Sequence, residues 1–412
     1  MPLSKSQLCE TPSLSRRKLL SISGSLVASA FIPKFARAAA GRDPRFITII
    51  LRGAMDGLSA VAPVGDPYYA ALHGDLALTQ SGDNAGLPLD SFFSLNPAMT
   101  NFARLFAKGE AAVVHATATA YRDRSHFDGQ DVLESGYAGP GRTDSCWLNR
   151  AIAALPQGQR ISGKENSLAV GAVAPLVIRG PAETLGWAPA NLPKTNDDTA
   201  RRLLDLYTHK DPQLAKLLSA GLTTQKLASG AMMGMDNSDK PGDMVQQARG
   251  AARLMAADDG PRIAAMAFDG WDTHENEGGA TGRLFNLLGG LDGALAEFEK
   301  TLGEAWKQTA IVVMTEFGRT AQVNGTVGTD HGTGTLAFLA GGAVAGGRVI
   351  ADWPGLSPAK LYQNRDLKPT TDLRAVIKGL LADQLGVNES VLAQDVFPDS
   401  NDAKPMRGLI KA

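Results

Sequence analysis

The chain has 412 residues, of which 44% are hydrophobic and 20% are charged, a composition that fits a folded protein and argues against extensive disorder. Lysine and arginine total 41 against 42 acidic residues, so the formal net charge of −1 gives no field that would attract nucleic acid or an anionic membrane. The length allows a sizeable core in one large domain or two ordinary ones.

The first forty residues carry the features of an export signal. Arg16 and Arg17 form a twin-arginine pattern, and a weakly apolar run from Leu19 to Pro33 follows it. That run is too polar and too short for a membrane span, and Ala36-Arg37-Ala38 after it offers a small-x-small cleavage site. We therefore expect residues 1–38 to be a signal peptide recognised by the Tat translocase. The mature protein would act in the periplasm or outside the cell, without a membrane span.

Cysteine usage is compatible with export in the folded state. Cys9 lies in the expected signal, so the mature chain keeps only Cys146 and cannot form an intramolecular disulfide. Twin-arginine passengers cross the membrane folded, which suits a protein that acquires a metal before export.

Short apolar runs alternate with helical patterns along the mature chain, which predicts an α/β fold with a mostly parallel sheet and helices on both faces. Residues 46–51 are rich in β-branched side chains without polar alternation, so we expect a buried central strand there. Further strands are predicted at 111–115, 263–268, 310–314 and 336–339.

Helices are predicted between these strands. Their expected positions are 147–152 (with Asp144 as a possible cap), 203–209, 244–255, 282–306 and 373–385. The stretch at about 151–261 is helix-rich and contains none of the motifs described below. We expect it to be a helical insertion in a single domain spanning 39–412.

Five polar segments follow the predicted strands, at 52–57, 124–128, 271–274, 315–319 and 328–333. Ligands of open α/β sheets bind at the carboxyl ends of the strands, so we expect these segments to converge. His126, His274 and His331 lie in them beside acidic or hydroxyl groups. Such sets suit zinc, manganese and similar ions, which predicts a divalent metal site without distinguishing Zn, Mn, Mg and Ca. The other histidines, His73, His115 and His209, lack such neighbours and are expected on the surface or in packing.

These segments together resemble a known bacterial family. L-R-G-A-M-D-G-L at 51–58, R-S-H-F-D at 124–128, G-W-D-T-H at 270–274, T-E-F-G-R-T at 315–320 and G-T-D-H-G-T at 328–333, with the twin-arginine signal, are similar to the family called domain of unknown function 1501. The resemblance covers essentially the whole mature chain. That family is regarded as sulfatase-like, within the alkaline phosphatase superfamily, which implies an alkaline-phosphatase-like three-layer sandwich.

The resemblance also implies roles for individual residues. Ser125 would be the nucleophile, with His126 beside it as ligand or base, and the metal ligands would be Asp56, Asp272, His274, Glu316, Asp330 and His331. Two features depart from the superfamily pattern: the Asp/His group is spaced D-x-H instead of D-x-x-x-H, and Phe317 stands where the T-S-D-H-G turn has a histidine. Phe317 cannot bind a metal, so one of two metal sites is weakened, rebuilt with Asp330 or missing, and one or two ions are expected.

Two alternatives stay open at this level. Asp330-His331 could itself be the Asp-His pair, which would leave no later histidine to complete the site. Ser125 could cap a helix that begins near Phe127 instead of attacking a substrate.

Three arginines, Arg52, Arg124 and Arg319, flank the loops and could hold a phosphate or sulfate ester bidentately, although arginines at turns are often simply solvated. The leading hypothesis is therefore an exported metal-dependent hydrolase of phosphate or sulfate esters, acting on a small-molecule or polymer substrate. Cys146-Trp147-Leu148-Asn149-Arg150 lacks the proline of a formylglycine motif, which disfavours a formylglycine sulfatase. The alternative is a non-catalytic metal- or polymer-binding periplasmic protein that retains the fold.

The export signal can be tested directly. Combining Arg16→Lys with Arg17→Lys should leave uncleaved precursor in the cytoplasm, because the twin-arginine pair is what the translocase recognises. The measurement is an immunoblot of cytoplasmic and periplasmic fractions, with N-terminal sequencing of the wild-type product, which should begin close after Ala38. Lys18→Arg, which leaves the pair intact, is the control. Normal export of the double variant would contradict the signal assignment.

Overall fold

The central sheet forms around its first strand. A computed structural model describes residues 42–156, 167–189, 197–212, 214–216, 218–219, 221–222 and 244–412, and the expected signal at 1–38 lies outside them. In this part of the chain nine strands form one sheet, in the order β11 (Arg348–Ile350), β5 (Ala111–Ala118), β10 (Thr335–Ala340), β9 (Thr309–Thr315), β1 (Arg45–Leu51), β8 (Ile263–Phe268), β6 (Ser167–Val170) and β7 (Leu185–Trp187), with β12 (Thr371–Asp372) paired to β5. All seven residues of β1 are buried, as its unbroken apolar pattern predicted.

Most of the sheet is parallel, and one strand runs the other way. β1 pairs in parallel with β8 and β9, whereas β10 is antiparallel to both β5 and β9. The first residue of β10 therefore lies at the edge where its neighbours end. The predicted α/β class with a mostly parallel sheet is confirmed.

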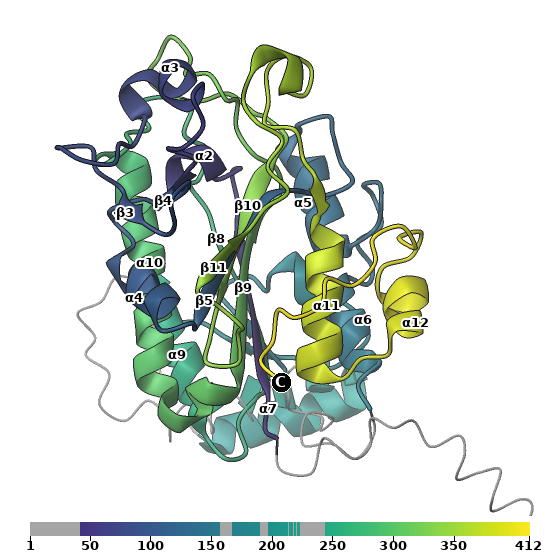
Figure 1. The fold of residues 1–412 in the computed structure, drawn as a ribbon. Coiled ribbons are helices and arrows are strands. Elements are labelled where there is room, and N and C mark those ends of the chain that lie inside the picture. The colour runs from purple at the N-terminus through teal and green to yellow at the C-terminus, as the bar shows by residue number, and fades with distance from the viewer. Residues whose placement is uncertain are drawn as a thin grey trace, which may run out of the picture. The chain divides into compact units, whose positions relative to one another are not determined.

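Helices cover both faces of the sheet (Figure 1). On one face α4 (Thr100–Ala107), α9 (Met244–Ala256) and α10 (Arg283–Leu302) pack against Ile47 and Ile49 of β1. On the other face α5 (His126–Ser135), α6 (Trp147–Ala153) and α11 (Leu373–Leu385) pack against Phe46 and Ile50. Successive side chains of a strand point to opposite faces, so one short strand contributes to two hydrophobic cores. The result is the predicted three-layer arrangement.

The stretch 151–261 contributes to the sheet as well as to its helices. It contains α7 (Asp197–Lys210) and α9, but also β6 and β7, which extend the sheet beside β8. The stretch is therefore not purely helical. With four and three residues, β6 and β7 are too short to show a readable period in the sequence. The cap of α6 also differs from expectation, because its N-cap residue is Cys146 and not Asp144.

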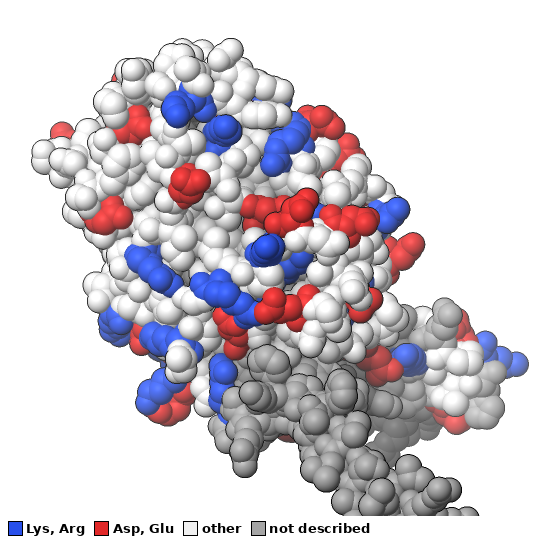
Figure 2. Space-filling view, turned by 45° about the vertical axis from the view of Figure 1, so that its right-hand side comes forward, with Lys and Arg blue, Asp and Glu red and all other residues white. Residues whose placement is uncertain are grey.

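Smaller elements complete the described fold. Between β1 and β5 lie α2 (Gly57–Ala60), α3 (Tyr69–His73) and an antiparallel sheet of β2 (Val61–Ala62), β4 (Ser94–Leu95) and β3 (Leu87–Pro88). Short helical turns occur at Gly74–Leu76, Leu176–Ile178, Gly303–Gln308, Pro358–Lys360, Glu389–Val391 (α12) and Leu392–Val396. None of the described helices is both long and apolar enough to cross a membrane. Figure 2 shows acidic and basic side chains interspersed over one face, in line with the balanced net charge.

The close packing of α11 leads to a test of the fold. A Cβ added at Gly379 would lie 1.9 Å from the carbonyl oxygen of Met406, whereas one at Gly289 in α10 would meet nothing within 4 Å. We expect Gly379→Ala to destabilise the protein by about 1–3 kcal/mol, because backbone must move to make room. Gly289→Ala, the matched control, should stabilise it by up to about 1 kcal/mol through helix propensity. Denaturant unfolding measures both, and equal effects would contradict this packing.

Candidate metal centre

Four chain segments bring imidazoles and carboxylates to one edge of the sheet. His126 is the first residue of α5, Asp272 and His274 follow β8, Glu316 directly follows β9, and His331 precedes β10. The parallel strands β8 and β9 end at this edge and the antiparallel β10 begins there. The topology therefore accounts for the convergence of residues that are far apart in the chain.

Three imidazole Nε2 atoms face the carboxylate of Asp272. His126 Nε2 lies 3.4 Å from Asp272 Oδ2, while His274 Nε2 and His331 Nε2 lie 3.1 and 3.4 Å from Asp272 Oδ1. The Nε2 atoms of His274 and His331 are 2.9 Å apart. Within the described chain, ligand atoms of His126, Asp272 and His331 all lie within 4.8 Å of one another. Two ring nitrogens this close need a proton or a metal ion between them, so the donors fit a shared cation.

Each of these rings is held by an acceptor on its other nitrogen. The Nδ1 atoms of His126, His274 and His331 donate to Glu316 Oε1 at 2.8 Å, Asp330 Oδ1 at 3.2 Å and the carbonyl oxygen of Arg124 at 3.0 Å. A proton on Nδ1 leaves the lone pair on Nε2, which is the tautomer that binds a metal. His126 Nε2 is buried and has no hydrogen-bond partner among the described residues, and a metal ion would satisfy it.

Glu316 lies behind His126 and not among the ligand atoms. Its buried carboxylate accepts from the Gly53 N–H at 2.9 Å, from Gln130 Nε2 at 3.1 Å and from the Thr315 hydroxyl at 2.9 Å, in addition to His126. Burial alone would raise the pKa of Glu316, but these donors bring it below its ordinary value. The hydrogen bond between His126 and Glu316 raises the pKa of His126. Glu316 therefore orients His126, and its role as a metal ligand stays a prediction.

Two further residues contact the imidazoles: Asp330, which we predicted as a metal ligand, and Phe317, which stands where a ligand was expected. Asp330 is exposed and accepts from His274 Nδ1 and from Asn324 Nδ2, so it lies behind His274 as Glu316 lies behind His126. Phe317 is buried, with its ring centroid 5.1 Å from that of His126 and 5.3 Å from that of His331. In place of a ligand, Phe317 supplies an apolar wall against two imidazoles.

The three arginines that we expected to bind an ester are held within the protein. Arg319 is fully buried and donates to Asp272 Oδ1 at 2.5 Å and to the carbonyl oxygens of Gly53, Ala54, Trp271 and Thr329. Arg124 donates to Asp366 Oδ2 at 2.7 and 2.9 Å, and Arg52 to Glu134 Oε1 at 2.7 and 3.2 Å. A buried guanidinium is tolerated only when its donors are satisfied, which explains these partners.

Arg319 also sets the charge of the central carboxylate. Burial would raise the pKa of Asp272, but the hydrogen bond from Arg319 brings the pKa below its ordinary value, so Asp272 stays ionised. Glycine at position 53 allows the loop after β1 to approach Asp272 closely. Its φ is 120°, and a Cβ there would lie 2.5 Å from the backbone nitrogen of Asp272. The loop after β1 therefore lies directly against the loop that carries Asp272.

Ser125 occupies the N-cap position of α5, one residue before His126. Its side chain makes no capping hydrogen bond, and its N–H donates to the Tyr121 hydroxyl at 3.2 Å. The position is thus the one that the capping alternative predicted, but the hydroxyl is not used to cap the helix. The nucleophilic role of Ser125 stays a prediction.

Asp56 belongs to a separate buried group. Its Oδ1 accepts from the Leu58 and Ser59 N–H groups at 2.8 and 3.1 Å and so caps α2, and its Oδ2 lies 3.7 Å from His73 Nε2. We predicted Asp56 as a metal ligand, but it stabilises the turn after β1 and is not part of the group around Asp272.

His73 and His115 lie outside the metal group. His73 Nε2 lies 2.8 Å from the Ser59 hydroxyl, so this buried ring has polar company that the sequence did not reveal. His115 is a buried packing residue that stacks on Phe93, and burial lowers its pKa to about 4. The side chain of His209 lies outside the described residues.

Glu277 belongs to the buried group around Asp56, and the sequence analysis missed it. Its Oε2 accepts from the Thr329 hydroxyl at 2.6 Å, while Glu277 Oε1 and Asp56 Oδ2 are buried and have no donor in the part of the chain that the structure describes. Burial and the charge of Asp56 raise the pKa of Glu277 well above its ordinary value. A proton on Glu277 would satisfy both oxygens, in agreement with the raised pKa of this carboxyl. No sequence signal marked it, because it lies three residues beyond the motif at 270–274, after two exposed polar residues.

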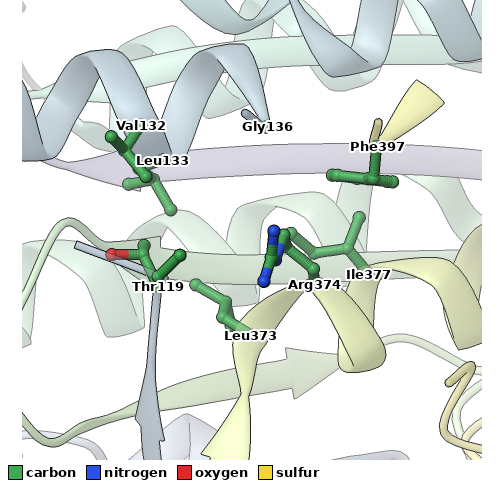
Figure 3. Close-up of a pocket in the computed structure, with 9 residues that line it drawn as sticks. Thr119, Val132, Leu133, Gly136, Leu373, Arg374, Ile377 and Phe397 are labelled. Atoms are coloured by element: carbon green, nitrogen blue, oxygen red, sulfur yellow. The ribbon is translucent and has the colours of Figure 1, made fainter. Parts of the chain in front are cut away.

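A pocket outside the candidate metal centre has a different lining. Figure 3 shows a small, mostly apolar pocket between α5 and the start of α11, lined by Thr119, Ala120, Val132, Leu133, Gly136, Leu373, Arg374, Ile377 and Phe397. Its one charged residue, Arg374, is held by Asp372 at 2.7 Å. Cys146 is also buried, and burial raises the pKa of its thiol to about 12, which keeps it unreactive.

The shared proton gives a pH-dependent prediction. The folded protein binds the Glu277 proton more tightly than the unfolded chain does. This contribution to stability is therefore full below the ordinary carboxyl pKa of about 4.3 and is lost as the pH rises through the raised pKa. Glu277→Gln keeps the shape and is always neutral, so its free energy of unfolding should depend less on pH.

Denaturant titrations between about pH 5 and about pH 9 measure this difference. Glu275→Gln, the same change at an exposed position two residues away, should follow the wild-type curve. A Glu277→Gln curve parallel to wild type would rule out the shared proton.

Comparisons with known proteins identify the family of this chain. Three solved structures overlap the chain loosely. A structure of Ps i-CgsB in complex with k-i-k-neocarrahexaose shares 9% identity over 88% of this chain and 77% of that one, with a TM-score of 0.42. A protein in the alkaline phosphatase superfamily from Vibrio parahaemolyticus shares 11% over 80% and 69%, with a TM-score of 0.33. PsFucS1 sulfatase from Pseudoalteromonas sp. shares 13% over 79% and 68%, with a TM-score of 0.35. At these scores the overlap carries no argument about chemistry.

No match was found among curated proteins. The family model described as "Protein of unknown function (DUF1501)" matches residues 43–396, which is most of the chain and includes every residue of the candidate metal centre. The family resemblance predicted from the motifs is thus confirmed, and the chain belongs to the DUF1501 family.

Proposed function

We propose that this protein is an exported metal-dependent hydrolase of phosphate or sulfate esters. The observation that carries the proposal is the convergence of three imidazole Nε2 atoms on the Asp272 carboxylate, each ring held in the metal-binding tautomer by an acceptor on Nδ1. Structural packing alone does not require three rings to direct their lone pairs to one place. A metal site does.

The donor set supports one ion of the zinc or manganese type. Three nitrogens and one carboxylate suit a tetrahedral first-row ion, whereas Mg²⁺ and Ca²⁺ prefer oxygen ligands. The charges support a divalent ion as well. Asp272, Asp330 and Glu316 outnumber the one buried cation of the group, Arg319, so an anionic ester would be repelled unless an ion offsets the excess negative charge.

The chain's own residues have separate tasks in the proposed reaction. A divalent ion held here would withdraw charge from an ester oxygen and lower the pKa of an oxygen nucleophile. Asp272 and the histidines hold and orient it, and Glu316 keeps His126 in the correct tautomer. The Ser125 hydroxyl, next to His126 and free of capping, is the proposed nucleophile. Side-chain exposures of 22 to 41% at His126, His331, His274 and Asp272 leave access for a substrate.

Export is part of the proposal, and the sequence is what supports it. The twin-arginine pattern at Arg16 and Arg17 supports a signal peptide at 1–38, the Tat translocase as transport partner and a periplasmic or extracellular site of action. Residues 39–412 would then form the mature alkaline-phosphatase-like domain, with 151–261 as an insertion that shares its sheet. The order of the polar segments along the chain supports that relationship.

Two observations favour a second candidate, a non-catalytic metal- or polymer-binding periplasmic protein. The arginines expected to bind an ester are all engaged within the protein, and Phe317 stands where a ligand would complete a second metal site. Such a protein would bind the ion and catalyse no reaction.

Metal content and ester turnover together test the proposal. Asp272→Asn and His331→Ala should lose bound metal and turnover together, because both supply ligand atoms. Glu316→Gln should weaken metal affinity by about 10- to 100-fold, as expected for a residue that orients a ligand. Ser125→Ala should keep the metal and lose turnover. Metal is measured by mass spectrometry of the purified protein, and turnover with aryl phosphate and aryl sulfate.

Asp269→Asn, an exposed carboxylate three residues before Asp272, is the matched control and should behave like wild type. Full metal content in Asp272→Asn would sink the metal centre. Metal-loaded wild-type protein that hydrolyses neither ester would favour the binding protein, and full turnover by Ser125→Ala would remove the serine from the reaction.

A further inference from the structure

An exposed aromatic residue directly follows a residue of the candidate metal centre. Phe127 directly follows His126 at the start of α5, and its side chain is 86% exposed, more than any other large hydrophobic residue in the described chain. Single exposed apolar residues are common on protein surfaces, so exposure alone means little. Its position is informative, because the neighbouring residue directs Nε2 toward Asp272.

A second apolar residue lies on the loop that binds His274. Val327 is 46% exposed and has a φ of 57°, a left-handed conformation that is strained for a β-branched residue. Thr326 Oγ1 and Asn324 Nδ2 donate to the His274 carbonyl at 2.8 and 3.0 Å, and the Val327 carbonyl accepts from the Glu277 N–H at 3.0 Å. These contacts hold the loop against His274 and keep the exposed Val327 side chain in this conformation.

With the nearby arginines paired to carboxylates, exposed apolar residues such as Phe127 and Val327 would recognise the organic part of a substrate. Arg52, Arg124 and Arg319 each pair with a carboxylate of the protein. An ion would attract the phosphate or sulfate group, but it would not distinguish one alcohol part from another. An exposed phenyl ring next to a ligand does distinguish them, because a flat apolar face packs on it and a small alkyl group does not.

We infer that Phe127 and Val327 form an apolar rim of the metal centre that receives the ring of the substrate, either an aryl ring or the C–H face of a sugar. This inference rests on the proposed function and names its substrate class as ring-bearing esters. Phe127 is the main contact, and Val327 adds apolar surface from the loop at His274. Both are specificity-determining residues and take no part in holding the ion.

Calorimetric binding of two probes to the metal-loaded protein tests the inference. Phenylphosphonate carries a ring and methylphosphonate does not, and neither is hydrolysed as an ester. Phe127→Ala should weaken phenylphosphonate binding about tenfold, the effect of losing one aromatic contact with its buried area, and leave methylphosphonate within about twofold. Phe127→Trp should restore ring binding, and Val327→Ala should act in the same direction as Phe127→Ala but less. Metal content should stay at the wild-type level in all of them.

Leu206→Ala is the matched control, because Leu206 is 52% exposed on α7, which supplies no residue of the metal centre. Equal affinity of the wild-type protein for both probes, or equal losses for both probes in Phe127→Ala, would overturn the inference. Replacing phenylphosphonate by a glucose phosphonate distinguishes a sugar from an aryl ring.

Turnover separates this inference from the proposed function. If phenyl, glucose and methyl phosphate are hydrolysed with the same kcat/KM, the hydrolase stands and the rim is wrong. If none is hydrolysed while ring binding depends on Phe127, the rim stands and the hydrolase is wrong.

Discussion

The buried guanidinium of Arg319 ties together the loops on which the candidate site depends. It donates to carbonyl oxygens of the loop after β1, the loop after β8 and the loop before β10, and to the carboxylate of Asp272. Burying a cation is costly unless every donor finds a partner, so these loops are held in one arrangement. Because one partner is the central carboxylate, the position of Asp272 follows from the same hydrogen bonds that fix the loops. Arg319 therefore acts on the site by positioning, without contact with a substrate.

A second constraint acts on the direction of each imidazole. Glu316, Asp330 and a backbone carbonyl each accept from an Nδ1 atom, and this leaves the Nε2 atoms turned toward Asp272. Burial of Glu316 is tolerated because the protein gives its oxygens four donors. The carboxylates that hold the rings also make the group negative, so the proposed ion would complete both the coordination and the charge balance.

The sequence predicted the main strands, the helices of both faces and the convergence of the polar segments, because periodicity and the strand-end rule depend only on local pattern. It did not predict which side of a loop a carboxylate faces. Glu316 and Asp272 both follow strands, yet one is enclosed by donors and the other faces the imidazoles. Asp56 fits a first-strand ligand by position, but its Oδ1 accepts from backbone N–H groups at the start of α2. Glu277 follows the exposed Glu275 and Asn276, where no pattern indicates that the third polar residue is buried.

The departures from a two-ion pattern share one physical explanation. Phe317, in the place of a histidine ligand, stacks on His126 and packs against His331, so the space is filled by a ring. Asp56, in the place of the first-strand ligand, faces Glu277, and one shared proton meets the need that a cation would otherwise meet. In both places, groups of the protein take the position that a second ion and its ligand would have. Under the proposed function, these two features favour a single ion, with an oxygen nucleophile supplied by a protein side chain or by solvent at that ion. The hydroxyl of Ser125, which directly precedes His126 and does not cap the helix that follows, is the nucleophile in that proposal.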